Sequence, residues 1–337
     1  MAARPGENLD RDRGPETGDR VLHGTGATHA KGLGGHGWSL GASAPGATKP
    51  SRLGLMIVAI AVAVTASLAA RSQPSAPQRI VSIVPSITEM LFAMGAGPRV
   101  VGVSSFDHFP PAVEQLPRVG ALIDPDVERI LSLRPDLVIT YGSQADLNQQ
   151  LQRAGIATFV YKHGSLADIS ATMRLVGARL GMEEAGRREA DRLERSLAAV
   201  RNGAEGAGRP KTMLVIGREA GSLRSLQVSG GYGFLHDLVE CAGGDNVFGD
   251  VARESLDVTT ETVLARAPEV IIELHYTERP DERTVAAERS PWRALSAVPA
   301  VRNNRVVLLY GGELVVPGPR VARTAELFAD AIHREHR

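Results

Sequence analysis

The segment Glu128-Arg-Ile-Leu-Ser-Leu-Arg-Pro-Asp-Leu-Val-Ile139 decides the fold, because it aligns without a gap with Glu261-Thr-Val-Leu-Ala-Arg-Ala-Pro-Glu-Val-Ile-Ile272. Each copy is typical of a short helix that begins near a glutamate, stops before a proline and leads into a buried strand. Helix, proline and strand often follow one another, but the matching glutamates are less easily explained by chance. The repeat therefore predicts two lobes built on one plan.

Strands and helices alternate outward from this repeat. Apolar, β-branched runs in the first half predict strands from Arg79, at Val100 to Val103, at Leu137 to Thr140 and at Ala157 to Tyr161. Ser86 and Glu89 have the spacing of a capping box at the start of an apolar helix that Gly95 ends. Strand–helix alternation resumes from Lys211. Such alternation favours a parallel sheet covered by helices.

The stretch between the two halves carries a helical pattern and no strand signal. Apolar residues recur at helical spacing at Met173, Val176 and Leu180 and again at Leu193 and Leu197, with Gly181 as a point where the helix could break. We therefore predict an α/β protein with two Rossmann-like lobes, each with a parallel sheet, bridged by one long helix. The expected lobes are residues 79–165 and 210–337, with the bridging helix and its loop at 166–209.

The N-terminal part differs in composition. Residues 1–52 show no apolar period and are rich in glycine, arginine and proline, which predicts a disordered extension. Residues 53–71 form an apolar run after Lys49 and Arg52, which is typical of a signal peptide or a membrane anchor. Residues 72–78 then serve as a linker. This pattern predicts an exported protein, periplasmic or otherwise extracytoplasmic, that an uncleaved segment could tether.

Composition excludes several classes of function. The 38 basic and 38 acidic side chains balance, so nothing in the charge favours a nucleic acid as partner. The one cysteine, Cys241, can form no disulfide within the chain and is expected to be a buried, inert thiol. No nucleophile elbow, phosphate-binding loop or dinucleotide turn is found, so we predict no catalytic residue and no enzymatic cofactor. Nor does any histidine pair in the folded part show metal-ligand spacing.

Loops that follow the strands are the expected binding site, because ligands of open α/β sheets bind beyond the carboxyl ends of the strands. These loops concentrate aromatic side chains in a chain with only 4% aromatics. Alternatively, aromatic residues there only pin a loop to its lobe. The predicted cleft residues are Pro85, Ser86, Phe106, His108, Tyr141, Ser229 and Tyr232.

Glu128 and Glu261 allow two interpretations. A carboxylate in the first turn of a helix is stabilised by the helix dipole by about 0.3–1 kcal/mol, which alone could account for both. Alternatively, each lobe presents one acidic side chain to arginines of a partner protein. Spacing alone does not choose between them.

Several segments resemble the periplasmic vitamin B12-binding proteins, within the iron-chelate and cobalamin class of substrate-binding proteins. The resemblance rests on Val81 to Gly95, Val101 to Pro111, both copies of the repeat, Gly243 to Phe248 and Pro317 to Arg320, and it covers the chain from Arg79 onward. It implies a class III periplasmic binding protein of the helical-backbone type. It also implies that a monomer carries a small-molecule ligand, and that Glu128 and Glu261 dock on the permease subunits of an ABC transporter.

The resemblance implies that Phe106 and Tyr141 line the cleft and that a corrinoid is the transported ligand. Leu122 and Leu256 stand where that family would have tryptophans. Haem or a ferric siderophore is therefore the alternative ligand, with Tyr232 or His108 as an iron ligand. Two other classes of function stay open from sequence: a membrane-tethered enzyme or metal-insertion factor with this fold, and a signalling receptor domain on a single anchor.

Overall fold

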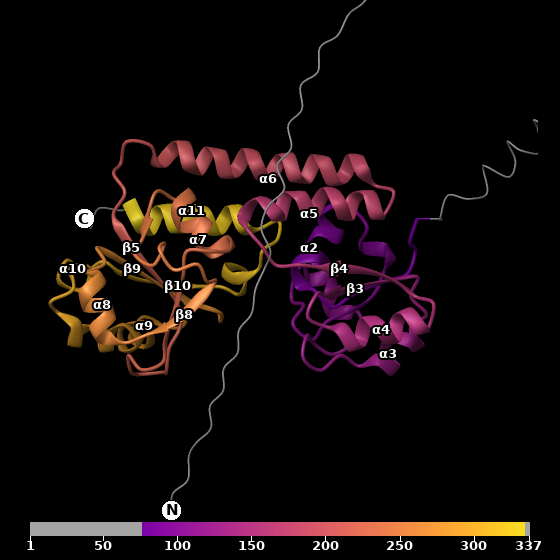
Figure 1. Ribbon diagram of the computed structural model, residues 1–337, viewed down its shortest axis with the longest axis horizontal. Helices are drawn as coiled ribbons and strands as arrows, with labels where there is room; N and C mark the ends of the chain where they lie inside the picture. Colours follow the sequence, from indigo (N-terminus) through magenta and orange to yellow (C-terminus); the bar gives the residue numbers. More distant parts are fainter. Residues whose placement is uncertain (1–75, 334–337) are drawn as a thin grey trace, which may run out of the picture. The chain divides into compact units, whose positions relative to one another are not determined.

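A computed structural model of the chain describes residues 76–333 (Figure 1). The predicted extension at 1–52 and the apolar segment at 53–71 lie outside the described residues. Within the described part, no helix combines the length and the apolar character that crossing a membrane requires.

The first lobe is built on a fully parallel sheet with strand order β2-β1-β3-β4. Alternating side chains of these strands are buried on its two faces: Ile80 and Leu137 contribute to one apolar core, and Val81 and Val138 to another. This double burial explains the uninterrupted apolar runs in the sequence. The elements are β1 (Ile80–Ser82), α2 (Pro85–Ala93), β2 (Val100–Val103), α3 (Val127–Ser132), β3 (Leu137–Tyr141), α4 (Ala145–Arg153) and β4 (Ala157–Tyr161), with short 3-10 helices η1 (Gly97–Arg99) and η2 (Pro111–Gln115).

The second lobe has a mixed sheet with strand order β10-β9-β5-β6-β8, and β7 pairs with β5. Strands β5, β9 and β10 are parallel, but β6 runs antiparallel to both of its neighbours. The α/β class is confirmed, whereas the expectation of a purely parallel second sheet is wrong. The reason is the short connection from Gly217 to Leu226, since a parallel crossover needs about a dozen residues or more.

The second lobe's strands are β5 (Lys211–Gly217), β6 (Leu226–Ser229), β7 (Asp245–Asn246), β8 (Ser255–Val258), β9 (Val270–His275) and β10 (Val306–Tyr310). Its helices are α7 (Phe234–Cys241), α8 (Thr260–Arg266), α9 (Glu282–Arg289), α10 (Pro299–Arg302) and α11 (Val321–His333), with 3-10 helices η3 (Ser290–Leu295) and η4 (Gly312–Val315). Cys241 is buried on α7, as expected, and burial raises the pKa of its thiol.

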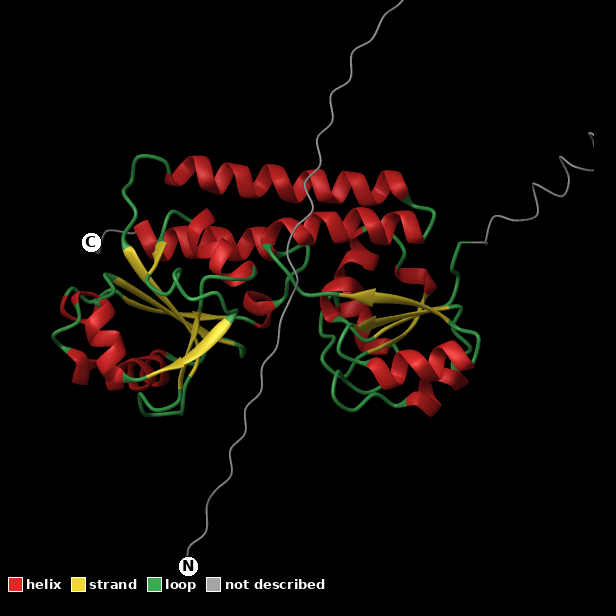
Figure 2. Cartoon of the chain, in the orientation of Figure 1, coloured by secondary structure: helices red, strands yellow, loops and turns green. Residues whose placement is uncertain are grey.

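Two helices, α5 (Leu166–Arg179) and α6 (Glu183–Ala204), occupy the bridging stretch. They form a hairpin that turns at Gly181, whose φ of 64° favours glycine. Gly177 and Gly186 let the helices cross closely, because a Cβ added at Gly177 would lie 2.8 Å from the Cα of Gly186. The 22-residue α6 packs against α5 and α11 and runs along both lobes (Figure 2). The long bridging helix is therefore α6, with α5 folded beneath it.

The capping box expected from Ser86 and Glu89 is wrong. Helix α2 begins at Pro85, its N-cap is Val84, and no side chain caps it. Ser86 is buried in the first turn, and the Glu89 carboxylate bonds to Arg320 instead. A buried carboxylate gains more from a guanidinium than from a backbone amide, which explains the different partner.

Candidate ligand-binding cleft

A polar clamp fixes the loop after β2. The buried carboxylate of Asp107 accepts hydrogen bonds from the Ser104 amide at 2.8 Å and the Ser104 hydroxyl at 2.6 Å. Arg118 donates to the carbonyls of Ser104 and Asp107 and forms an ion pair with Glu114 at 2.7 Å. Burial raises the pKa of the Asp107 carboxyl, and the hydrogen bonds from Ser104 offset this only in part. The clamp holds Phe106 outward, with 68% of its surface exposed.

The next loop along the sheet is tied to β3. The Gln144 side chain accepts a hydrogen bond from the Tyr141 amide at 2.9 Å and donates to the Leu122 carbonyl at 2.9 Å. Tyr141 is half-buried, and burial raises the pKa of its phenol to about 12. The phenol is therefore protonated at neutral pH and can donate a hydrogen bond to a ligand.

A line of rings leads from the first lobe to the second. Tyr141 and Tyr161 meet edge to face at 6.0 Å, Tyr161 and His163 at 6.2 Å, and His163 and Phe234 at 5.2 Å between ring centroids. Beside them, the Phe234 amide donates to the Gly164 carbonyl at 3.1 Å. Aromatic pairs of this geometry stabilise by about 0.5–1.5 kcal/mol each beyond the burial of their surface. The aromatic line therefore joins the end of β4 to the start of α7.

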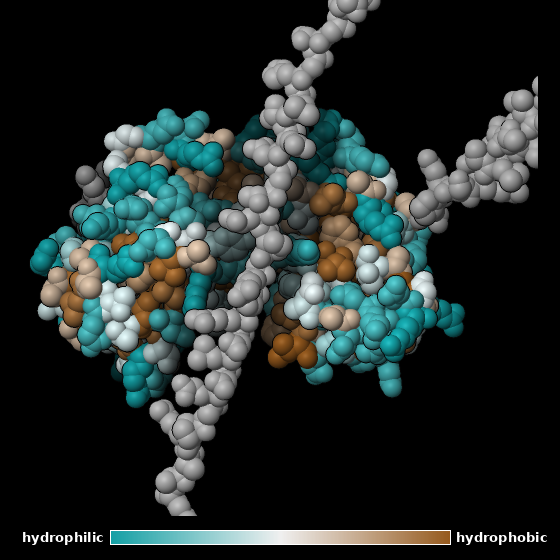
Figure 3. Space-filling model, in the orientation of Figure 1, coloured by the Kyte–Doolittle hydropathy of each residue, from teal (hydrophilic) through white to brown (hydrophobic). Residues whose placement is uncertain are grey.

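Both lobes contribute to cavities at this junction. One cavity of about 210 Å³ is lined by His163 from the first lobe and by Ile216, Tyr232 and Glu254 from the second. A neighbouring cavity of about 310 Å³ is lined by β4 and α5 and again by Tyr232. Figure 3 shows apolar surface over α5 and β4, where Leu175 and Val160 are exposed. A largely apolar cleft with a few polar groups is typical of small-molecule sites.

The predicted cleft residues differ in how exposed they are. Phe106 and Tyr232 are exposed, Pro85 and Tyr141 are half-buried, and His108 is exposed beside Glu114 at 3.3 Å. Ser86 and Ser229 are buried, and the Ser229 hydroxyl donates to the Gly230 carbonyl. Ser229 ends the antiparallel strand β6, so it does not share the carboxyl edge of β5 and β9. Only residues with exposed surface can contact a ligand in this conformation.

Arg320 joins the two lobes at a second place. Its guanidinium donates to both oxygens of Glu89 at 2.6 and 3.0 Å, and it lies 4.1 Å from the centroid of the Phe109 ring. Glu313 lies 3.6 Å away on the other side of the guanidinium. Burial raises the pKa of the Glu89 carboxyl, and Arg320 only partly offsets it. These partners are 231 residues apart in the sequence, and sequence reasoning did not predict their contact.

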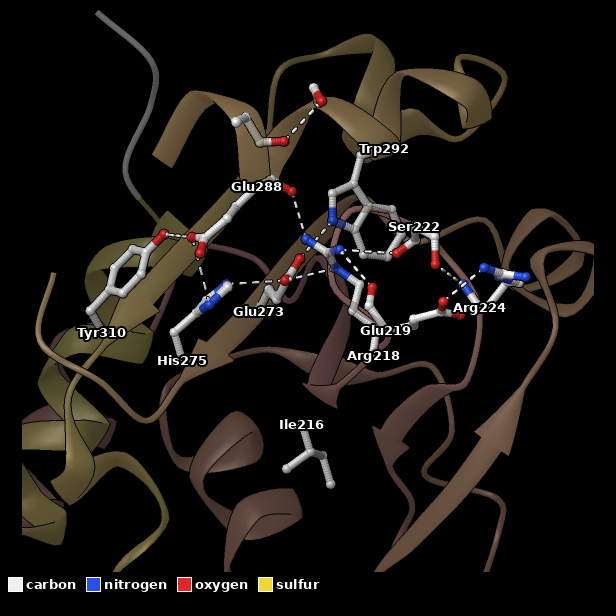
Figure 4. Close-up of polar contacts among 12 residues, drawn as sticks. Ile216, Arg218, Glu219, Ser222, Arg224, Glu273, His275, Glu288, Trp292 and Tyr310 are labelled. Atoms are coloured by element: carbon white, nitrogen blue, oxygen red, sulfur yellow. Dashed lines mark hydrogen bonds and ion pairs between the residues drawn. The ribbon is translucent and has the colours of Figure 1, made fainter. Parts of the chain in front are cut away.

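A buried polar cluster occupies the carboxyl ends of the parallel strands in the second lobe (Figure 4). At its centre, the Glu273 carboxylate accepts hydrogen bonds from Arg218 at 2.8 Å and from the Trp292 indole at 2.7 Å. His275 Nε2 lies 3.0 Å from the same carboxylate. Burial opposes ionisation of Glu273, but His275, Trp292 and Arg218 outweigh it and hold the pKa of that carboxyl below its usual range.

This cluster also holds surrounding loops in place. Arg218 donates to the carbonyls of Ser222 at 3.0 Å and Glu288 at 2.6 Å, and Tyr310 donates to the Glu288 carboxylate. The cluster thereby fixes the loop after β5 and helix α9 against the sheet. Sequence reasoning missed it, although Glu273 within the apolar run Val270–His275 was a usable signal.

Glu128 and Glu261 occupy equivalent places in the two lobes. Each is the second residue of a short helix, α3 or α8, and each side chain is exposed. A neighbouring side chain caps each helix: Asp126 accepts from the Arg129 amide, and Thr259 accepts from the Thr262 amide. Neither glutamate forms an ion pair with any residue of the described part. Both carboxylates therefore remain accessible to a partner.

This combination of two α/β lobes, a helical bridge and a cleft between the lobes defines a class of ligand-binding protein. Residues 80–311 match the family described as periplasmic binding protein, and the chain belongs to that family. Its relatives and structural neighbours are binding proteins, so the chain is a substrate-binding protein of the ABC-transporter type rather than an enzyme.

The chain is 28% identical to a vitamin B12-binding protein of Pectobacterium carotovorum over 251 residues, which cover 74% of this chain and 88% of that protein. It is 26% identical to an ABC transporter substrate-binding lipoprotein of Bacillus subtilis, covering 76% of this chain and 80% of that one. Among solved structures, the periplasmic heme-binding protein RhuT from Roseiflexus sp. RS-1 is 27% identical with a TM-score of 0.63, covering 77% of this chain and 100% of that chain. The periplasmic vitamin B12-binding protein of Vibrio cholerae has a TM-score of 0.65 at 24% identity, covering 77% and 98% of the two chains, and this likeness concerns the fold.

Proposed function

We propose that this protein captures a corrinoid in the cleft between its lobes and delivers it to the permease of an ABC importer. The observation that carries the proposal is the cavity lined by His163 from one lobe and Tyr232 from the other, because it offers a ligand contacts from both lobes. In this proposal the exposed ring of Phe106, which follows β2 and lines neither cavity, would add an apolar contact to a ligand large enough to reach it. The vitamin B12-binding relatives support a corrinoid as the ligand.

Haem or a ferric siderophore is the second candidate ligand. Tyr232 is 53% exposed and shares a cavity with His163, so a phenol and an imidazole border the same space. Both groups are good ligands for iron. His108, which is also exposed, is a further candidate iron ligand. The heme-binding structural neighbour at 27% identity supports this alternative.

An absorption spectrum of the protein purified from its own host separates these ligands. We expect corrinoid bands, and titration of the ligand-free protein with cyanocobalamin should quench the fluorescence of the protein to saturation. A Soret band, or the visible band of a ferric chelate, with no response to cyanocobalamin would replace the corrinoid by the second candidate.

We further infer that Glu128 and Glu261 are the contacts with the permease. Each lies in the first turn of its helix and is exposed, and the two belong to a repeated segment with one copy per lobe. A hydrogen bond from Thr259 lowers the pKa of Glu261, so this carboxylate is charged at neutral pH. Two negative side chains on separate lobes suit a partner with two arginines.

The combined Glu128→Ala and Glu261→Ala variant should lose ligand uptake in cells while its purified form keeps its affinity for the ligand. The matched control is Asp146→Ala with Glu205→Ala, which removes two exposed acids elsewhere and should leave uptake unchanged. Uptake that survives the first pair would show that docking does not use these glutamates.

We also propose an extracytoplasmic location, because the matched relatives include periplasmic and lipoprotein binding proteins. In this proposal residues 53–71 direct export. The intact mass of the mature protein tests it: a mass that starts near residue 72 indicates cleavage, and a mass that retains residues 53–71 indicates a tether. Recovery of the protein in the cytoplasmic fraction would contradict export.

A further inference from the structure

The outer edge of β10 is an unpaired strand edge. Within the described residues, β10 lies at the end of its sheet and pairs with β9 alone. The Ile271 amide donates to the Arg305 carbonyl at 3.0 Å, and the Gly311 amide donates to the His275 carbonyl at 2.9 Å. Successive residues of a strand direct their peptide groups to opposite sides. The odd-numbered residues therefore face β9, and the peptide groups of Val306, Leu308 and Tyr310 face outward.

A cavity of about 280 Å³ follows this edge. It is lined by four consecutive strand residues, Val306 to Leu309, by α11 and by three arginines. Because neighbouring side chains of a strand point to opposite faces, a cavity that touches all four must lie beside the backbone. A second cavity of about 150 Å³ shares Arg289, Asn304 and Val306 with the first and extends it to Arg293. The two cavities form one groove, which we call the β10 groove.

The two walls of the β10 groove differ in chemistry. On the side of α11, Leu327 and Ala331 line it, together with Asp330. On the side of α9 and η3, Arg289 and Arg293 are exposed, and neither forms a hydrogen bond or ion pair with a described residue. The first cavity is also lined by Arg279, which pairs with Glu282, and by Arg305, which donates to the Ile332 carbonyl, so the positive charge available to a partner is mainly that of Arg289 and Arg293. One wall is therefore basic and the other largely apolar.

We propose that the β10 groove binds an extended segment of a partner protein, with alternating acidic and apolar residues, as an added strand of the second sheet. An added strand would place alternate side chains on the two walls. Its acidic side chains would meet Arg289 and Arg293, and its apolar ones Leu327 and Ala331. A second copy of this chain fits less well, because edge-to-edge pairing would bring two sets of arginines together. The proposal is independent of the ligand in the cleft.

The probe is fluorescein-labelled acetyl-(Glu-Val)4-amide, measured by fluorescence anisotropy with the full chain. We expect saturable binding that weakens with salt, and no binding of (Lys-Val)4. The pair Arg289→Glu and Arg293→Glu should weaken binding by about tenfold or more, because each change turns an attraction into a repulsion. The matched control is Arg283→Glu with Arg302→Glu, which makes the same change of charge on exposed residues outside the groove. Equal loss with both pairs would overturn the site.

Strand addition has its own test. An (Glu-Val)4 peptide that is N-methylated at alternate residues keeps its charge but lacks the donors that pair with β10, so it should not bind. Amide exchange at Val306, Leu308 and Tyr310 should slow on adding the unmodified peptide. Unchanged exchange, or equal binding of the methylated peptide, would overturn the proposal. A dimer in sedimentation that the arginine pair disrupts would assign the edge to a second copy instead.

Discussion

Each lobe covers a sheet with helices and exposes a glutamate in the first turn of one helix, yet the two lobes stabilise the carboxyl ends of their parallel strands differently. In the first lobe, Asp107 accepts hydrogen bonds from Ser104, and burial raises its pKa. In the second lobe, Glu273 is ionised within a buried cluster around Arg218. The arrangement around Asp107 tolerates a neutral carboxyl group, whereas the arrangement around Glu273 requires an ionised carboxylate. Similar folds can thus place opposite demands on a buried carboxyl group.

Replacing Glu273 should have the largest effect on the free energy of unfolding. Glu273→Gln puts an amide NH2 group against the donor of either Arg218 or Trp292, which bond to different oxygens, and leaves the guanidinium buried without a counter-charge. We expect a loss of about 3–5 kcal/mol in the free energy of unfolding, measured by urea denaturation. The double variant Arg218→Met with Glu273→Leu should recover most of it, because no charge remains buried. A loss below about 1 kcal/mol in the single variant would remove the contrast between the lobes.

The corresponding changes in the first lobe should have smaller effects. Asp107→Ala leaves the amide and hydroxyl of Ser104 without their acceptor and should cost about 1–3 kcal/mol in the same measurement. Asp107→Asn keeps an acceptor oxygen for the Ser104 amide and should cost less than half of that. An Asp107→Asn loss as large as that of Glu273→Gln would show that the first lobe also depends on a buried charge.

Lowering the pH should change the stability of the two lobes in opposite directions. The pKa of Glu273 lies below its ordinary 4.5, so its stabilisation is complete above 4.5 and is lost as the pH falls through the lowered value. The pKa of Asp107 lies above its ordinary 3.8, so protonation of Asp107 adds stability as the pH falls toward 3.8. Between about pH 7 and pH 3, amide exchange in β9 should therefore speed up relative to β1, after correction for intrinsic rates. Equal changes in both strands would contradict these directions.

Changes of the exposed rings should affect stability least. Phe106→Ala and Tyr232→Ala remove side chains that are 68% and 53% exposed, so unfolding free energies should change by no more than about 0.5 kcal/mol. Affinity for the bound ligand should fall by about tenfold, or about 1.4 kcal/mol, in each variant, measured by titration. Unchanged affinity would mean that the ring in question does not line the ligand site.

Local patterns in the sequence predicted the α/β class and most elements. Apolar runs such as Val270 to Leu274 indicate buried strands, and proline at 135 and 268 marks where helices end. The strands Leu226–Ser229 and Ser255–Val258 were not predicted, because each has only two apolar residues separated by a polar one, so the antiparallel part of the second sheet was missed.

The candidate site was harder to predict, because its contacts join distant residues. Phe106 and Tyr232 were recognisable as loop aromatics, but the pairs Arg320–Glu89 and Arg218–Glu273 depend on how the chain folds back on itself. Burial changed the interpretation of Ser86 and Ser229, since a short polar residue after a strand is equally suited to a loop or to the core. Periodicity describes one element at a time, and these contacts belong to several.

The Arg320–Glu89 pair connects the two lobes at a second point, in addition to the helical bridge. Helix α6 runs along both lobes, and the buried carboxylate of Glu89 joins them again through Arg320. Separating the lobes at this point would part a carboxylate that is 4% exposed from its guanidinium, so the pair opposes such a separation. Glu313, 3.6 Å from the same guanidinium, forms a second and longer ion pair with it, so Arg320 is held by one carboxylate from each lobe.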